Sequence, residues 1–336
     1  MINFRSVLIS LAVVSSLTLT IWGIATKSNN NSTENTKPSP SHNTTDNTTG
    51  HTGKVKININ SAILSELDKL EAKLGVPALS NKIQAGRPYT KPEDLVVKKI
   101  ITQAQFEQIK DLVTIEDVIL TGEAKDIDFM TKMGLMKGHL LVAKELLDLQ
   151  KPDQAEPHIG HPIEEIYSDV EDQLKERKVK EFKTTLINLQ NQVKSNGKDA
   201  KVASNFDESM KSVDDAIATL PETQRQSPNF VLKVINGLLD AANSEYGAAI
   251  AKGKITEAIE YQDSRGFVSY SNTLYKTIAE KMAKENPAAH KEIESLMAQL
   301  LKAWPSATPP DAPVLMPEKV SELIKQIENN VQKVVK

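Results

Sequence analysis

Beyond residue 120, apolar side chains recur every three to four positions, which is the period of an amphipathic helix. In the run FMTKMGLMKGHLLVAKELLDLQ, for example, Leu135, Val142, Leu146 and Leu149 fall on one face. The same pattern predicts helices at residues 128–150, 162–195, 206–220, 228–252, 255–285 and 288–303. We therefore predict an all-α fold, in which residues 120–303 form an antiparallel α-helical bundle.

The segment after these helices, AWPSATPPDAPVLMP, is rich in proline, which cannot continue a helix and favours an extended chain. We predict that residues 304–336 form a proline-rich strap followed by an amphipathic helix at 318–335 that docks back onto the bundle. Within the bundle, Gly253 separates two helical segments, and its position is typical of a helix C-cap.

The beginning of the chain has a different pattern. Residues 7–26 form an uncharged apolar run, VLISLAVVSSLTLTIWGIAT, with Arg5 before it. About 20 apolar residues suffice to span a bilayer, so we predict a signal anchor in residues 1–26, with a cleaved signal peptide as the alternative. Either one exports the remainder, because the basic end stays in the cytoplasm. In residues 27–53, 17 of 27 side chains are Ser, Thr or Asn, which predicts a disordered linker.

Composition narrows the possible functions. The chain has no cysteine, which excludes thiolate catalysis, disulfides and thiolate metal sites. It also lacks a nucleophile elbow, a phosphate-binding Walker loop, a dinucleotide fingerprint and an HExxH zinc motif. We therefore expect a protein that binds rather than catalyses.

Between residues 54 and 118, the helical segments are short and are broken by Gly75, Pro77, Gly86 and Pro88. The sequence KININSAILSELDKLEAKLGVPALSNKIQAGRPYTKPEDLVVKKIITQAQFEQIKDLVTI resembles the tandem helix-hairpin-helix module of the competence protein ComEA family. That family shows an I-x-x-N-x-A start, then L-x-x-L and a G-h-G-x-x-x-A-x-x-I hairpin. The match is degenerate here, because Pro77 replaces the second hairpin glycine and has no N–H to donate.

The resemblance implies a small helix-hairpin-helix domain that binds a phosphate of DNA through backbone N–H groups at a helix N-terminus. The residues that would carry DNA binding are Gly75, Val76, Lys73, Lys82, Arg87, Lys98 and Lys99. The alternative is that the module only packs against protein. A similar degenerate pair occurs in the photosystem extrinsic protein PsbU, where the fold serves protein packing.

Histidines are the main candidates for metal chemistry in the second part of the chain. His139 lies on the apolar line of its helix and is expected to point inward. The run HIGHPIEEIY places His161 before Pro162, so that Pro162 fits helix position N1 and Glu164 fits N3, where its carboxylate caps the helix. His158 falls in the loop before that predicted helix.

Acidic residues share buried faces with these histidines. Glu245, Glu260 and Asp263 all fall on apolar stripes, where a carboxylate is costly unless a cation, a hydrogen bond or a metal neutralises it. Inward His and carboxylate side chains on several helices are the arrangement by which helical bundles hold iron, zinc or related divalent transition metals. The candidate ligands are His139, His158, His161, Glu164, Glu165, Glu245, Glu260 and Asp263. The alternative is a structural ion-pair network, in which Lys137, Lys254 or Arg265 pairs with Glu260 and Asp263.

The runs E-Y-x-A and G-K-I-x-x-x-x-E-Y between Glu245 and Tyr261 also resemble exported helical domains associated with bacterial iron uptake. Two hypotheses follow. The first is a membrane-anchored accessory of the cell envelope that faces the periplasm or the exterior, binds a metal ion and contacts an envelope partner. The second is a ComEA-like surface DNA-binding protein whose bundle is a spacer or a partner-docking domain.

Overall fold

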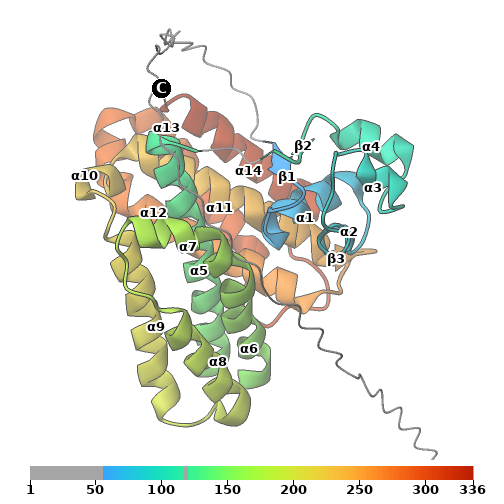
Figure 1. Cartoon of the computed structure of the whole chain (residues 1–336). Helices are drawn as coiled ribbons and strands as arrows, with labels where there is room; N and C mark the ends of the chain where they lie inside the picture. Colours follow the sequence, from blue (N-terminus) through green and yellow to red (C-terminus); the bar gives the residue numbers. More distant parts are fainter. Residues whose placement is uncertain (1–55, 117–119, 336) are drawn as a thin grey trace, which may run out of the picture. The chain divides into compact units, whose positions relative to one another are not determined.

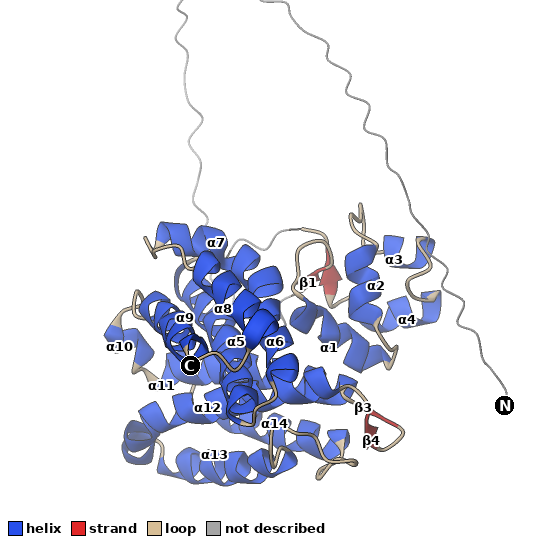
Figure 2. Ribbon diagram, turned by 90° about the horizontal axis from the view of Figure 1, so that it is seen from below, coloured by secondary structure: helices blue, strands red, loops and turns tan. Residues whose placement is uncertain are grey.

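The structure is a computed structural model that describes residues 56–116 and 120–335. Over these residues the predicted all-α fold is confirmed, since helices dominate and the strands are short (Figures 1 and 2). Within the same residues, no helix combines the length and apolar character that a membrane span requires. The predicted anchor at 7–26 and the predicted linker at 27–53 lie outside the described residues.

The first part of the described chain has a small core of its own. Its elements are β1 (Ile57–Asn58), α1 (Leu64–Leu74), α2 (Leu79–Ala85), α3 (Asp94–Val97), α4 (Gln103–Ile109) and β2 (Val113–Thr114). Strands β1 and β2 pair in parallel, with Ile57 opposite Val113. Leu67, Leu79 and Phe106 are among the buried side chains that these short helices enclose.

Long helices follow. The first set consists of α5 (Gly122–Asp148), α6 (Pro152–His161), the π-helical turn η1 (Pro162–Ile166), α7 (Tyr167–Glu176), α8 (Lys183–Asn196), α9 (Lys201–Ile217) and α10 (Glu222–Arg225). Helix α5 packs against α6 and α9, and α8 packs between α6 and α9. In Figure 1, α5, α6, α8 and α9 run side by side, shown in green to yellow.

The second set forms a closed ring. It consists of α11 (Pro228–Ala248), β3 (Ile250–Ala251), β4 (Lys254–Ile255), α12 (Ala258–Glu285), α13 (Pro287–Leu300), the 3-10 turn η2 (Leu301–Ala303) and α14 (Pro317–Gln332). Helix α11 contacts α12, α12 contacts α13, α13 contacts α14, and α14 returns to α11. Helix α5 packs on α11 and α12, so one continuous core joins both sets.

Several predicted boundaries are wrong. The single helix expected at 162–195 is interrupted after Glu176, and the chain restarts as α8 at Lys183. Gly253 is not a helix C-cap: it forms the turn of the β3–β4 hairpin together with Lys252, and both have positive φ. A two-residue turn with both φ positive matches the twist of paired strands, which explains why glycine is favoured there.

Candidate metal centre

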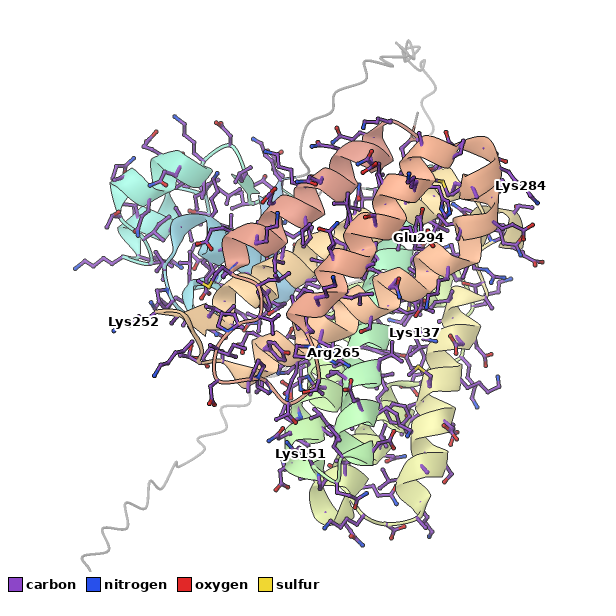
Figure 3. All side chains as sticks on the ribbon, turned by 180° about the vertical axis from the view of Figure 1, so that it is seen from behind. Lys137, Lys151, Lys252, Arg265, Lys284 and Glu294 are labelled. Carbon is purple, nitrogen blue, oxygen red and sulfur yellow. The ribbon has the colours of Figure 1, made fainter. Side chains whose placement is uncertain are left out.

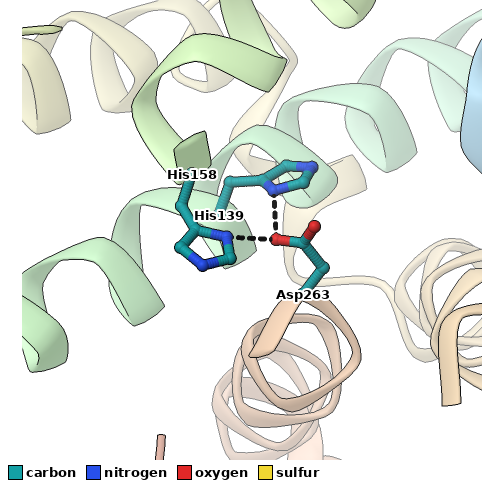
Figure 4. Close-up of side chains that lie close together, drawn as sticks. All are labelled: His139, His158 and Asp263. Carbon is teal, nitrogen blue, oxygen red and sulfur yellow. Dashed lines mark hydrogen bonds and ion pairs between the residues drawn. The ribbon is translucent and has the colours of Figure 1, made fainter. Parts of the chain in front are cut away.

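Three helices bring three buried side chains together. His139 comes from α5, His158 from α6 and Asp263 from α12, and their ligand atoms all lie within 4.8 Å of one another (Figure 4). The Nδ1 atoms of both histidines lie 2.6 Å from the same carboxylate oxygen, Oδ1 of Asp263. Of the candidate ligands predicted from sequence, these are the three that the structure brings closest.

The donor set suits a transition metal. Zinc binds histidine nitrogen and carboxylate oxygen at about 2.0–2.2 Å, so neighbouring ligand atoms around one ion lie about 3 Å apart. The 2.6 Å contacts of Asp263 are hydrogen-bond distances, with the imidazole N–H groups donating to the carboxylate. A metal ion would therefore replace these hydrogens, after small shifts of the rings.

His161 lies at the edge of this group. Its Nδ1 atom is 3.4 Å from Oδ2 of Asp263, and 31% of its side chain is exposed, whereas that of His158 is fully buried. Although burial opposes a charged imidazole, the carboxylates of Asp263 and Glu165 raise the pKa of His161 to about 9. His161 is thus the most exposed of the three histidines.

The pKa values of Asp263 and His139 depend on each other. Burial alone would raise the pKa of Asp263, but His139 and His158 hold it well below its usual range. Burial lowers the pKa of His139, and the charge of Asp263 offsets only part of that effect. Asp263 therefore stays ionised, and it is the negative charge that a cation at this position would meet.

Further carboxyl groups surround the centre. Burial raises the pKa of Glu165 to about 7, and burial also raises the pKa of Glu260 and of Glu245, the last of which is almost fully enclosed. Asp68 of α1 hydrogen bonds to Glu245, and burial raises the pKa of Asp68 to about 7. Asp68 is not among the candidates predicted from sequence, because its proximity to Glu245 depends on how α1 docks on α11.

Three predictions about the HIGHPIEEIY run are wrong. Pro162 does not begin a helix, because α6 already runs from Pro152 and continues through η1 into α7. His158 is therefore buried in a helix rather than placed in a loop, and Glu164 is an exposed side chain instead of a cap. Since Pro162 has no N–H, the chain forms a π turn here, in which the N–H of Tyr167 donates to the carbonyl of Pro162.

The predicted ion-pair alternative does not describe Asp263. Arg265 pairs with Glu145, with Nε 2.8 Å from Oε2, and Lys137 pairs with Asp214. Both cations are labelled in Figure 3, and both side chains are partly buried. Among the ion pairs of the described residues, Asp263 has only histidine partners.

In the helix-hairpin-helix module, the backbone N–H groups that could bind an anion are already hydrogen bonded to a side chain of the module. The carboxylate of Glu71 accepts hydrogen bonds from the backbone N–H groups of Ala78, at 2.8 Å, and Ser80, at 3.2 Å. These N–H groups lie at the start of α2, where the family resemblance would place a DNA phosphate. The hairpin glycine Gly75 is in the left-handed conformation that the turn requires.

The basic residues proposed for DNA differ in their surroundings. Arg87 donates to the carbonyl oxygens of Ile59 and Ala62, and Lys98 donates to those of Gly86 and Pro88. Lys82 donates to the carbonyl of Pro77 in the hairpin. The remaining residues of the set, Val76, Lys73 and Lys99, lie in or beside the two hairpin turns, and both lysines are exposed.

Comparison with known proteins identifies two parts of the chain. No curated protein and no solved structure matches the chain. Residues 52–114 match the model of the helix-hairpin-helix motif, and residues 221–336 match the model of the iron permease-associated 4-helix bundle domain. The second match contains the ring α11–α14 and Asp263, whereas His139 and His158 precede it. The chain thus carries a helix-hairpin-helix motif and, in residues 221–336, an iron permease-associated 4-helix bundle domain.

Proposed function

We propose that this protein is a metal-binding accessory of iron uptake in the cell envelope, and that His139, His158 and Asp263 hold the ion. The observation that carries the proposal is the convergence of these three buried ligand atoms from three helices within 4.8 Å. Buried histidines around a buried carboxylate are costly to assemble unless the group is hydrogen bonded or binds a cation. The ion is the cargo in this proposal, and the protein supplies binding.

The chemistry of the ligands favours a divalent transition metal. Imidazole nitrogen with carboxylate oxygen suits iron or zinc, and the chain offers no thiolate that would favour softer ions. The matched domain is described as iron permease-associated, which supports iron as the ion. His161, at the exposed edge, is placed to complete the ligand set as an ion enters.

The location in the envelope rests on a different observation. The apolar run at 7–26, followed by a polar stretch, is the pattern of an exported protein with a membrane anchor. A membrane attachment would keep the binding domain close to a permease, which is the partner that the domain description suggests. Fractionation of cells that express the full chain tests this part: recovery in the soluble cytoplasmic fraction would contradict it.

Metal analysis tests the site itself. The full chain is purified without chelator, and its iron and zinc contents are compared with those of Asp263→Asn and of His290→Gln. Asp263→Asn keeps the shape of the side chain but removes the charge that both histidines face. His290→Gln is the matched control, because His290 contacts Tyr275 with Nδ1 3.0 Å from the hydroxyl and takes no part in the centre. We expect near-stoichiometric metal in the wild type and the control, and loss in Asp263→Asn. Equal or zero content in all three folded proteins would contradict the proposal.

A further inference from the structure

The proline-rich strap is hydrogen bonded to the turn of α12 that carries Asp263. The neighbours of Asp263 in sequence make these contacts. The Tyr261 hydroxyl donates to the Ser306 carbonyl at 3.1 Å, and Gln262 Nε2 donates to the Ala307 carbonyl at 3.0 Å. Arg265 donates to the Trp304 carbonyl at 2.5 Å, and the Trp304 indole N–H donates to Ser264 Oγ at 2.7 Å. The strap is therefore fixed directly behind the candidate metal centre.

One of these contacts, that of Gln262, connects the strap to His158, a candidate metal ligand. The side chain of Gln262 is almost completely buried, and its Oε1 atom lies 2.8 Å from Nε2 of His158. Its Nε2 atom donates to the carbonyl of Ala307. If the amide were turned over, its oxygen would face the carbonyl oxygen of Ala307, which cannot donate. The strap carbonyl therefore fixes which end of Gln262 faces His158.

This orientation of Gln262 determines that Nε2 of His158 carries a hydrogen. Because Gln262 presents an acceptor, Nε2 of His158 must carry a hydrogen. The other nitrogen, Nδ1, faces Asp263 and is the one that belongs to the candidate centre. When a metal ion takes the place of the hydrogen on Nδ1, the hydrogen bond to Asp263 is lost, and the bond from Nε2–H to Gln262 is then the side-chain contact that keeps the ring oriented.

We propose that Gln262 is a positioning residue, which holds the His158 ring with Nδ1 directed at the candidate metal centre, and that Ala307 of the strap holds Gln262 in turn. This inference rests on the proposed function. Hydrogen bonds from the second nitrogen of a ligand histidine fix its tautomer and orientation, and losing such a bond weakens metal binding by about 10–100-fold.

The test uses Gln262→Met, which keeps the volume but removes both polar atoms, and Gln262→Glu, whose protonated carboxyl group keeps an acceptor toward His158 and a donor toward the Ala307 carbonyl. Gln154→Met is the matched control, because the Gln154 side chain lies 3.4 Å from that of Gln262, whereas the His158 side chain hydrogen bonds to Asp263 and Gln262. In the folded full chain, Zn²⁺ affinity is measured by chelator competition, and the imidazole nitrogens of His158 are observed by NMR in the metal-free protein.

We expect Gln262→Met to bind Zn²⁺ about 10–100-fold more weakly and to shift the Nε2 signal of His158, because that nitrogen loses its acceptor. Gln262→Glu should keep the wild-type nitrogen signals and stay within a few-fold of the wild-type affinity, as should Gln154→Met. Unchanged signals and affinity in Gln262→Met would overturn the inference, and so would an equal loss in Gln262→Glu. If the wild type binds no Zn²⁺ while Gln262→Met still shifts the His158 signals, the proposed metal function fails and the positioning role stands.

Discussion

Gly138 of α5 and Gly266 of α12 lie in backbone contact. A Cβ atom on Gly266 would lie 2.2 Å from the carbonyl oxygen of Gly138, a distance that real side chains do not tolerate. His139 follows Gly138 directly, and Asp263 lies three residues before Gly266, almost one helical turn away. The close approach of the two helices is thus what brings His139 within hydrogen-bond distance of Asp263.

Gly266→Ala should therefore separate the two helices. The added methyl group meets backbone rather than a flexible side chain, so the helices must move, and overpacking of this kind costs about 1–3 kcal/mol or more of unfolding free energy. We expect a lower Tm and weaker metal binding, measured by thermal unfolding and by Zn²⁺ competition.

Gly247→Ala is the matched control for this substitution. Gly247 lies near the end of α11, and its added Cβ would meet only the Cβ of Ala72, at 3.9 Å. Since alanine is favoured over glycine in a helix by about 1 kcal/mol, this variant should be neutral or more stable. A similar loss in both variants would show that the crossing of α5 and α12 has no special role.

The centre shows what could be predicted from the sequence. The helical period of the apolar residues places His139 on the buried face of its helix, and the same argument places Glu245 and Asp263 among apolar neighbours. The structure buries all three side chains. Periodicity indicates which face of a helix is buried, and a charge on that face is costly to bury. Both inferences need only the local sequence.

Positions that depend on tertiary packing could not be predicted in this way. Pro162, taken as the start of a helix, suggests a loop around His158, but the helix continues through Pro157 and Pro162, because packing against neighbouring helices outweighs the local cost of proline. Asp68 has no local signal for its role, since it meets Glu245 only through the docking of α1 on α11.

Asp68→Asn tests that inter-module contact. The pKa of Asp68 is raised from 3.8 to about 7, so the folded protein binds a proton that the unfolded chain releases, and this part of the stability falls as pH rises from about 4 to 7. An asparagine has no proton to lose. We expect the variant to be more stable than the wild type at pH 8, on the order of 1–2 kcal/mol since the side chain is only partly enclosed, and similar at pH 4. Urea unfolding at both values measures this, and a variant that is less stable at pH 8 would contradict it.

The helix-hairpin-helix module gives a prediction about DNA. Because Glu71 already accepts from the N–H groups of Ala78 and Ser80, a phosphate would have to displace a carboxylate and overcome its charge. We expect no retardation of duplex DNA by the wild-type chain in low salt. A shift that disappears steeply with added salt would instead support DNA binding.

Glu71→Gln tests whether the Glu71 carboxylate stabilises the start of α2. The amide keeps an acceptor for one N–H group but removes the charge, so we expect a loss of about 0.5–2 kcal/mol in unfolding free energy, as for other helix caps. Glu107→Gln is a suitable control, because Glu107 is exposed and pairs only with neighbours on its own helix and at that helix's end. Equal stability of both variants would show that Glu71 does not cap α2.

His161→Gln tests the charge at the edge of the centre. The pKa of His161 is raised from 6.5 to about 9, so its charged form stabilises the folded protein fully below about pH 6.5, and this contribution is lost as pH rises through 9. In metal-free protein, we expect the variant to lose on the order of 1–2 kcal/mol at pH 6, reduced by the partial exposure of the ring, and to match the wild type at pH 10. Urea unfolding in the presence of a chelator measures both values. Asp263 supplies most of the stabilising charge, and Glu165, with a pKa of about 7, is mostly protonated at pH 6, so Glu165→Gln should leave the difference at pH 6 nearly unchanged. An equal difference at both pH values would show that His161 acts through packing and not through charge.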